Sequence, residues 1–147
     1  MSQMNQRGMK GLNQVRRMRQ DKLEEMGQSY QRQQAHTHKQ GEQLQMLGEL
    51  YDTCQVVNGE SALAWQNRST IRDSLQHLAK VQAQQLALAQ SEQRRLQQDV
   101  VKQHVSVKTL ETVIGRREKQ QLRVEARQEQ KLSDEMAMQS YLRNVQR

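Results

Sequence analysis

Histidine and cysteine are the residues of this 147-residue sequence with the most accessible chemistry, but their spacing gives them no shared site. His36 and His38 are two positions apart, so on a helix they face different directions and cannot share a metal ion. Cys54 is the single cysteine, which leaves no internal disulfide and fits a reducing compartment. The glycines are scattered and do not form a phosphate-binding loop, and no serine, histidine and acid share a plausible scaffold. We therefore expect no metal, no cofactor, no catalytic residue and no enzymatic activity.

The composition excludes most compact folds. The chain has no proline and no phenylalanine, and aromatic residues make up 3% of it. Hydrophobic residues amount to 34%, well below the roughly 45–50% of a globular domain. Good helix formers are abundant, which argues against disorder despite a net charge of +7. A long helical rod needs only an apolar stripe, so it suits this composition better than a globule or a membrane-spanning protein.

Two stripes repeat with alternating spacings of three and four, the a/d pattern of a coiled coil. The first lies in an expected helix over about 4–55 and comprises Leu23, Met26, Tyr30, Gln33, Thr37, Gln40, Leu44, Leu47, Tyr51 and Cys54. The second lies in an expected helix over about 62–142 and comprises Leu75, Ala79, Gln82, Leu86, Ala89, Gln93, Leu96, Val100, Gln103, Val107, Leu110, Ile114, Arg117, Gln121 and Val124.

We expect a turn at about 56–61, because Asn58-Gly59 is the strongest turn dipeptide present and Ser61 can cap the helix that follows. Helices joined by so short a turn are antiparallel neighbours. Folding the chain there pairs residues whose numbers add to about 122. The sequence thus predicts an all-α fold, with a single domain over 1–147 that is an antiparallel two-helix coiled-coil hairpin in the form of an elongated rod.

Charge is spread unevenly along this expected rod. Residues 1–40 carry a net charge of +5, residues 41–70 carry −3 and residues 116–147 carry +3, so the two basic ends meet in a hairpin. On composition alone, such basic charge favours a nucleic-acid partner, but stacking aromatics and recognised motifs are missing. Solvated helix faces and docking into an acidic protein socket are the other interpretations. The basic clusters are Lys10, Arg16, Arg17, Arg19 and Lys22, and Arg116, Arg117, Lys119, Arg123 and Arg127.

Apolar residues near the turn exceed what two facing seams need. They include Leu47, Leu50, Leu63, Trp65, Ile71, Leu75 and Leu78. An exposed apolar patch on a thin rod usually marks a partner site. Trp65 could equally close the end of the hairpin without contacting a partner.

The chain resembles the flagellar type III export FliJ family in three segments: EQLQMLGELYDTC at 42–54, SALAWQNRSTIRDSLQHLAKVQAQQL at 61–86 and REKQQLRVEARQEQKLSDEMA at 117–137. The resemblance implies a fold similar to the central stalk of rotary ATP synthases. It also implies a non-enzymatic export component that serves flagellum biogenesis and motility. Its expected location is the cytoplasm, peripheral at the cytoplasmic face of the inner membrane.

The resemblance further implies partners at the two ends of the hairpin, and it implies no nucleic acid. The end holding the termini would enter the hexameric export ATPase FliI, where the basic residues are Arg16, Arg17, Arg19, Arg116, Arg117 and Arg123. The end holding the turn residues Asn58, Gly59 and Trp65 would contact the export-gate protein FlhA through Gln43, Leu47, Leu50, Cys54, Ile71, Leu75, Leu78 and Gln82. Export chaperones would be escorted as well. The chain departs from the family in lacking the aromatic residues often found at positions 50, 54 and 71.

Three alternatives remain on sequence grounds. An injectisome stalk protein would share the architecture. A basic coiled-coil nucleic-acid binder would lose affinity steeply with salt. A homodimeric coiled-coil scaffold would form a single helix through 55–62, against which Asn58-Gly59 argues.

Overall fold

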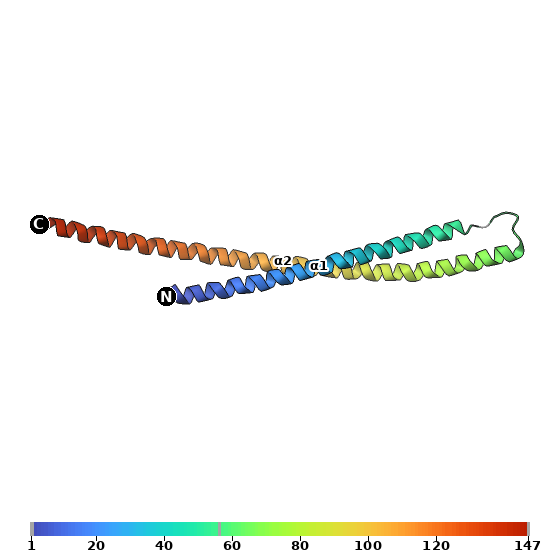
Figure 1. The fold of residues 1–147 in the computed structure, drawn as a ribbon, viewed down its shortest axis with the longest axis horizontal. Helices are drawn as coiled ribbons and strands as arrows, with labels where there is room; N and C mark the ends of the chain where they lie inside the picture. The colour runs from blue at the N-terminus through green and yellow to red at the C-terminus, as the bar shows by residue number, and fades with distance from the viewer. Residues whose placement is uncertain (1, 56, 147) are drawn as a thin grey trace. The chain divides into compact units, whose positions relative to one another are not determined.

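Two long α-helices form the chain. The computed structural model describes residues 2–55 and 57–146, with side chains from residue 7 onward. Helix α1 spans Ser2–Thr53 and helix α2 spans Ala62–Val145 (Figure 1). Val56, at the start of the expected turn, lies outside the described residues. The predicted all-α hairpin is confirmed, since the described part of the chain contains these two helices and no strand.

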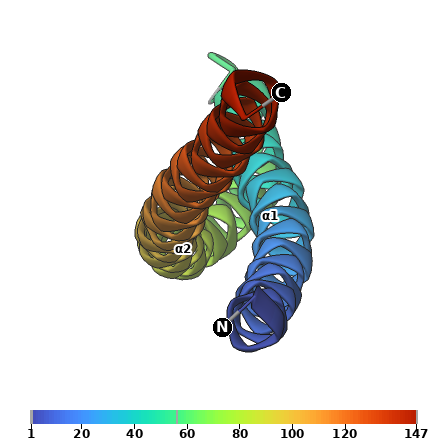
Figure 2. The same cartoon turned by 90° about the vertical axis from the view of Figure 1, so that its left-hand side faces the viewer.

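The chain divides into two compact units. The hairpin unit comprises residues 21–104, and the terminal unit comprises residues 1–20 and 105–147. In the hairpin unit, α1 and α2 lie side by side and run in opposite directions (Figures 1 and 2). In the terminal unit, the first turns of α1 meet α2 where Arg19 Nη1 donates a hydrogen bond to Ser106 Oγ at 2.9 Å. Over the described residues, neither helix has an apolar stretch that could cross a membrane.

Burial in the hairpin unit follows the predicted stripes. Every stripe position from Leu23 to Cys54 on α1, and from Leu75 to Gln103 on α2, is half-buried or buried, whereas most positions between them are exposed. Ala89 is the deepest of these side chains, with 6% of its surface exposed. A narrow covered stripe along each helix is what a two-helix coiled coil provides. We call the two stripes together the seam.

Polar side chains set the register of the seam. Gln33 Nε2 donates to the carbonyl oxygen of Ala89 at 3.1 Å. Thr37 Oγ1 donates to the carbonyl oxygen of Gln33 at 2.9 Å and lies 3.3 Å from the same Ala89 oxygen. Gln82 Nε2 donates to the carbonyl oxygen of Gln40 at 3.1 Å. The residue numbers of these partners add to between 122 and 126, in agreement with the predicted pairing. A shifted register would leave half-buried amides without partners, at a cost of about 1–3 kcal/mol each.

Three of the four buried apolar side chains among the described residues lie on α2 in the terminal unit, outside the turn-proximal region that the sequence emphasises. Val107 and Ile114 each expose only 4% of their surface, and Leu110 exposes 9%. The half-buried side chains of α1 in this unit include Met9 and Leu12, which continue the stripe of α1 upstream of its predicted start.

The predicted stripe on α2 ends earlier than expected. Arg117 and Val124 are exposed, and Gln121 is the last half-buried residue of the helix. In the observed register, Val124 lies opposite the first residues of α1, so little of that helix remains to cover it. The Arg117 side chain instead keeps its charged head in water, because burial of an unpaired charge is costly.

The loop between the helices contains the expected turn and cap. Gly59 has a φ of +93°, a conformation that glycine adopts without the steric cost other residues incur. The backbone N–H of Ala64 donates to Ser61 Oγ at 3.3 Å, so Ser61 caps α2 as predicted.

Arg68 ties the two sides of the loop together. Its Nη1 donates to the carbonyl oxygen of Gln55 at 2.7 Å, just after α1 ends. Its Nη2 lies 2.6 Å from Glu60 Oε1, just before α2 begins. One guanidinium therefore holds both ends of the loop, using the planar, forked donor geometry that lysine lacks.

Two glycines predict stability changes of opposite sign. Gly48 lies within α1 with no atom within 4 Å of an added Cβ, so Gly48→Ala should raise the free energy of unfolding by about 1 kcal/mol. Gly59→Ala should lower it by about 1 kcal/mol, because alanine resists a φ of +93°. Urea denaturation followed by circular dichroism measures both changes. A destabilised Gly48→Ala variant would contradict the continuous helix described for α1.

Candidate functional site

The residues predicted to contact the export gate fall into two sets. Leu47, Cys54, Leu75 and Gln82 are half-buried on the seam, where they pack between the helices. The Gln82 amide is occupied there, since Nε2 donates to Gln40 and also to Gln43 Oε1 at 3.2 Å. These seam residues present only part of their surface to a partner.

The other set is exposed. Leu50, Ile71 and Leu78 keep 48%, 50% and 52% of their surface accessible, and Gln43 is exposed as well. Each of the three apolar residues directly precedes a half-buried residue at position a of its helix. The three residues themselves therefore occupy position g of the heptad. Reversing the direction of one helix brings its g positions next to those of the other, so all three lie on the same side of the hairpin unit.

Two further apolar residues join this side. Met46 and Val81 occupy position c, next to position g on the helix surface, and expose 60% and 40% of their area. We call the set the outer stripe: Met46, Leu50, Ile71, Leu78 and Val81. The sequence reasoning missed Met46 and Val81. Both could have been found by assigning every heptad position and not only a and d, because position c can be counted directly from the sequence.

The turn residues are exposed beside the loop and are not part of the outer stripe. Trp65 is 54% exposed, and Asn58 and Gly59 are exposed as well. Closer to the seam, the Arg72 guanidinium lies 4.5 Å from the centre of the Tyr51 ring, a cation–π contact between the helices. Trp65 therefore offers an aromatic surface beside the loop and is not packed into it.

The residues predicted to contact the ATPase all belong to the terminal unit, but they differ in how much of the side chain is exposed to solvent. Arg17, Arg19, Arg116, Arg117 and Arg123 are exposed. Arg16 is half-buried on the seam, and its Nε is buried without a hydrogen-bond partner among the described residues.

The exposed Arg19 donates a hydrogen bond from Nη1 to Ser106 Oγ, and its charge remains accessible. The five exposed arginines therefore make up the accessible positive charge of the predicted contact. We call the set the basic face; its members lie on more than one side of the two helices, since Arg17 is at position b and Arg116 and Arg123 are at position c.

The described residues offer little catalytic chemistry. They contain no cluster of three or more histidine, cysteine or acidic residues that could hold a metal ion. Arg95 hydrogen-bonds to Glu92 and lowers the pKa of that carboxyl, but the pair lies on the surface of one helix, with Arg95 exposed and Glu92 half-buried. Such a pair is a helix-surface interaction between residues three apart.

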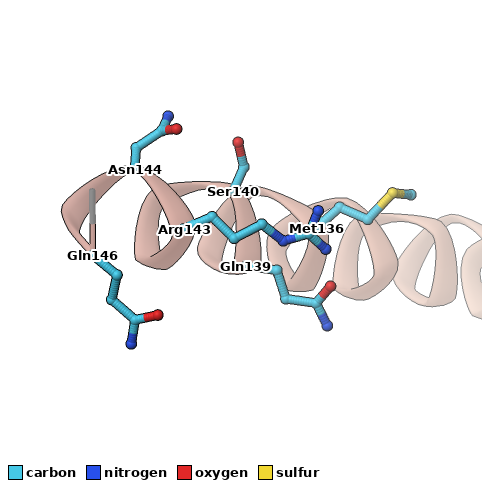
Figure 3. Close-up of a pocket in the computed structure, with 6 residues that line it drawn as sticks. All are labelled: Met136, Gln139, Ser140, Arg143, Asn144 and Gln146. Atoms are coloured by element: carbon cyan, nitrogen blue, oxygen red, sulfur yellow. The ribbon is translucent and has the colours of Figure 1, made fainter.

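A shallow hollow lies along the last turns of α2 (Figure 3). The side chains around it project in different directions from a single helix and do not enclose a common point. The hollow therefore lacks the convergent polar groups of a ligand site. Its lining residues are Met136, Gln139, Ser140, Arg143, Asn144 and Gln146.

The fold and the surfaces define a class of two-helix coiled-coil proteins that act through contacts along the helices. The sequence model of the flagellar FliJ protein family matches residues 9–146, nearly the whole chain, and the chain belongs to this family. No curated protein and no solved structure gives a significant match. Family membership assigns the chain to the proteins of flagellar export.

The division between seam and outer stripe predicts a contrast between two leucines three residues apart. Leu47→Asp should lower the free energy of unfolding by about 2–3 kcal/mol, because it places a carboxylate on the half-buried seam. Leu50→Asp should change it by no more than about 0.5 kcal/mol, because that side chain is exposed. Thermal and urea melts of the two variants give the comparison. Equal losses of stability would contradict the assignment of Leu50 to the surface.

Proposed function

We propose that the chain is a non-enzymatic coupling component of the flagellar export apparatus. It joins the hexameric export ATPase FliI to the export-gate protein FlhA and escorts export chaperones, at the cytoplasmic face of the inner membrane. The observation that carries this proposal is that the chain has two unlike surfaces, the basic face among residues of the terminal unit and the apolar outer stripe among residues of the hairpin unit. A protein that binds two machines needs two such chemically distinct surfaces.

The basic face suits the ATPase. A socket lined by carboxylates or carbonyl oxygens attracts a helix pair that carries exposed arginines, and the guanidinium binds such oxygens with defined geometry. Binding that favours the assembled ring stabilises it by mass action, and this alone raises ATP turnover without any catalytic residue on the chain. Because Arg16 is half-buried, the five exposed members of the cluster carry this contact.

The outer stripe suits the gate. It is a narrow apolar surface between solvated helix faces, the arrangement in which a few large side chains supply most of the binding energy. Leu50 and Ile71 stand at two of the positions where the family often has aromatic residues, so the stripe offers a more aliphatic contact there. A partner segment with its own apolar row would cover it.

The experiment that tests the proposal is ATP hydrolysis by the cognate FliI-type ATPase with and without stoichiometric protein. We expect a higher turnover with the protein present. Binding to duplex DNA, measured in parallel over a range of salt concentrations, tests the alternative. No stimulation together with steeply salt-dependent DNA binding would overturn the proposal in favour of a nucleic-acid binder.

Charge reversal on the basic face should separate the two partners. The double variant Arg116→Glu/Arg117→Glu should reduce ATPase stimulation at least tenfold, because it replaces two attractive contacts with repulsive ones, and should leave FlhA binding unchanged. Arg94→Glu is the matched control, since Arg94 is an exposed arginine of the hairpin unit. Equal stimulation by the wild type and the double variant would remove the basic face from the ATPase contact.

Changes in the outer stripe should have the opposite effect. The double variant Leu50→Asp/Leu78→Asp should weaken binding to the cytoplasmic part of FlhA about a hundredfold and abolish motility, because it charges an apolar contact. Its ATPase stimulation and helical signal should stay at wild-type values. Val101→Asp is the control, because Val101 is an exposed valine at position b, on the other side of the hairpin unit from the outer stripe. Undiminished FlhA binding by the double variant would show that the gate contact lies elsewhere.

A further inference from the structure

The last part of α2 is a helix with no cover. From Leu122 to Gln146, every described side chain is exposed, although the segment belongs to the terminal unit and forms a continuous helix as far as Val145. Several of these side chains are large and apolar, and between 46% and 69% of their surface is accessible: Leu122, Val124, Leu132, Met136, Met138, Tyr141, Leu142 and Val145. Isolated helices gain most of their stability from packing, so an uncovered stretch of this length favours a partner.

The seam of α2 continues through this segment in an unbroken register. Ile114 and Gln121 are successive a positions of the seam. From Gln121, alternating steps of three and four residues give the next seam positions: Val124, Gln128, Lys131, Glu135, Met138, Leu142 and Val145. Within the terminal unit, the same register upstream is covered by α1 at Val107, Leu110 and Ile114. The segment therefore continues the heptad register of the α1–α2 interface into a part of α2 that α1 does not cover.

The pattern along this extension is self-complementary. Apolar residues occupy its two ends, with Val124 at one and Leu142 at the other, and charges of opposite sign occupy its centre as Lys131 and Glu135. When the segment is read in reverse, it again presents an apolar end, a charged centre and an apolar end. A sequence with this property can pair with a copy of itself about a twofold axis.

We propose that residues 121–145 of two copies pair as an antiparallel coiled coil. In this arrangement Val124 of one copy packs against Leu142 of the other, and Gln128 packs against Met138. Lys131 faces Glu135 at the centre, and the twofold axis repeats each pair. The interface spans about three and a half heptads, the length at which a heptad pattern sustains a coiled coil.

Charge selects the antiparallel direction. A parallel, in-register pair would place Lys131 against Lys131 and Glu135 against Glu135 of the second copy, and like charges on a seam oppose association. The antiparallel pair turns both contacts into ion pairs. Neither residue has an ion pair elsewhere among the described residues, so the charges are available.

The arrangement places particular residues near the twofold axis. Leu132 follows the seam position Lys131 and therefore lies on the flank of the interface, close to Leu132 of the second copy. Met136 occupies position b, one step farther from the seam than position e of Leu132, and is therefore outside the proposed interface. The two residues are equally apolar and equally exposed to solvent in the single chain, which makes them a matched pair.

Cysteine cross-linking of the full chain tests the pairing. In a Cys54→Ser background, Leu132→Cys should give a covalent dimer under mild oxidation at protein concentrations up to about 1 mM, and Met136→Cys should not. Leu142→Cys, which would meet its own copy only in a parallel pair, should also stay monomeric. Failure of Leu132→Cys to cross-link, equal cross-linking at Met136, or cross-linking at Leu142 alone would each overturn the proposal.

Charge exchange at the centre gives an independent test without cysteines. Lys131→Glu should raise the dimer dissociation constant at least tenfold in sedimentation equilibrium, and the double variant Lys131→Glu/Glu135→Lys should restore it. Lys119→Glu makes the same change in net charge on the outer face of the helix and should leave the constant unchanged. Dimerisation of Lys131→Glu as strong as that of the wild type would overturn the proposal. These readouts need no ATPase or gate protein, so they stand or fall separately from the proposed function.

Discussion

The seam between α1 and α2 is the constraint on which the rest of the structure depends. Only Ala89, Val107, Leu110 and Ile114 are buried among the described hydrophobic residues, so there is no conventional core to hold the fold. The helices must instead cover a narrow stripe along their length. Whichever residues lie on that stripe lose access to partners, and whichever lie beside it become the functional surface. A shift of the pairing would therefore move every surface at once.

Hydrogen bonds in the seam make that pairing specific at the expense of packing. An apolar side chain at Gln33, Gln40 or Gln82 would bury more hydrophobic surface than an amide does. The amides instead reach the carbonyl oxygens of Ala89 and Gln40 on the facing helix, which a shifted register would not offer at the same points. Polar residues that fix register within an otherwise permissive coiled coil are known to act in this way. The seam amides thus make the hairpin unit less stable than apolar side chains would, but they fix the register that places the outer stripe.

Much of the fold could be predicted from the sequence because heptad spacing is a local signal. The stripe from Leu23 to Cys54, the turn at Gly59 and the cap at Ser61 all lie where the pattern indicates. Near the turn it was harder to predict which apolar residues lie on the seam and which on the surface, because Leu47 and Leu50 have the same side chain and differ only in heptad position. The loop contacts of Arg68 have no sequence signal, because they depend on where the loop returns in space.

The measurement that tests the central claim most directly is a register assay by intramolecular disulfide formation. In a Cys54→Ser background, the pair Thr37→Cys/Ala89→Cys should form a disulfide within one chain under mild oxidation, because the Thr37 hydroxyl lies 3.3 Å from the Ala89 carbonyl oxygen. The pair Thr37→Cys/Leu96→Cys is displaced by one heptad on the same stripe and should remain reduced. Efficient closure of the shifted pair, or of neither, would contradict the register on which both proposed surfaces rest.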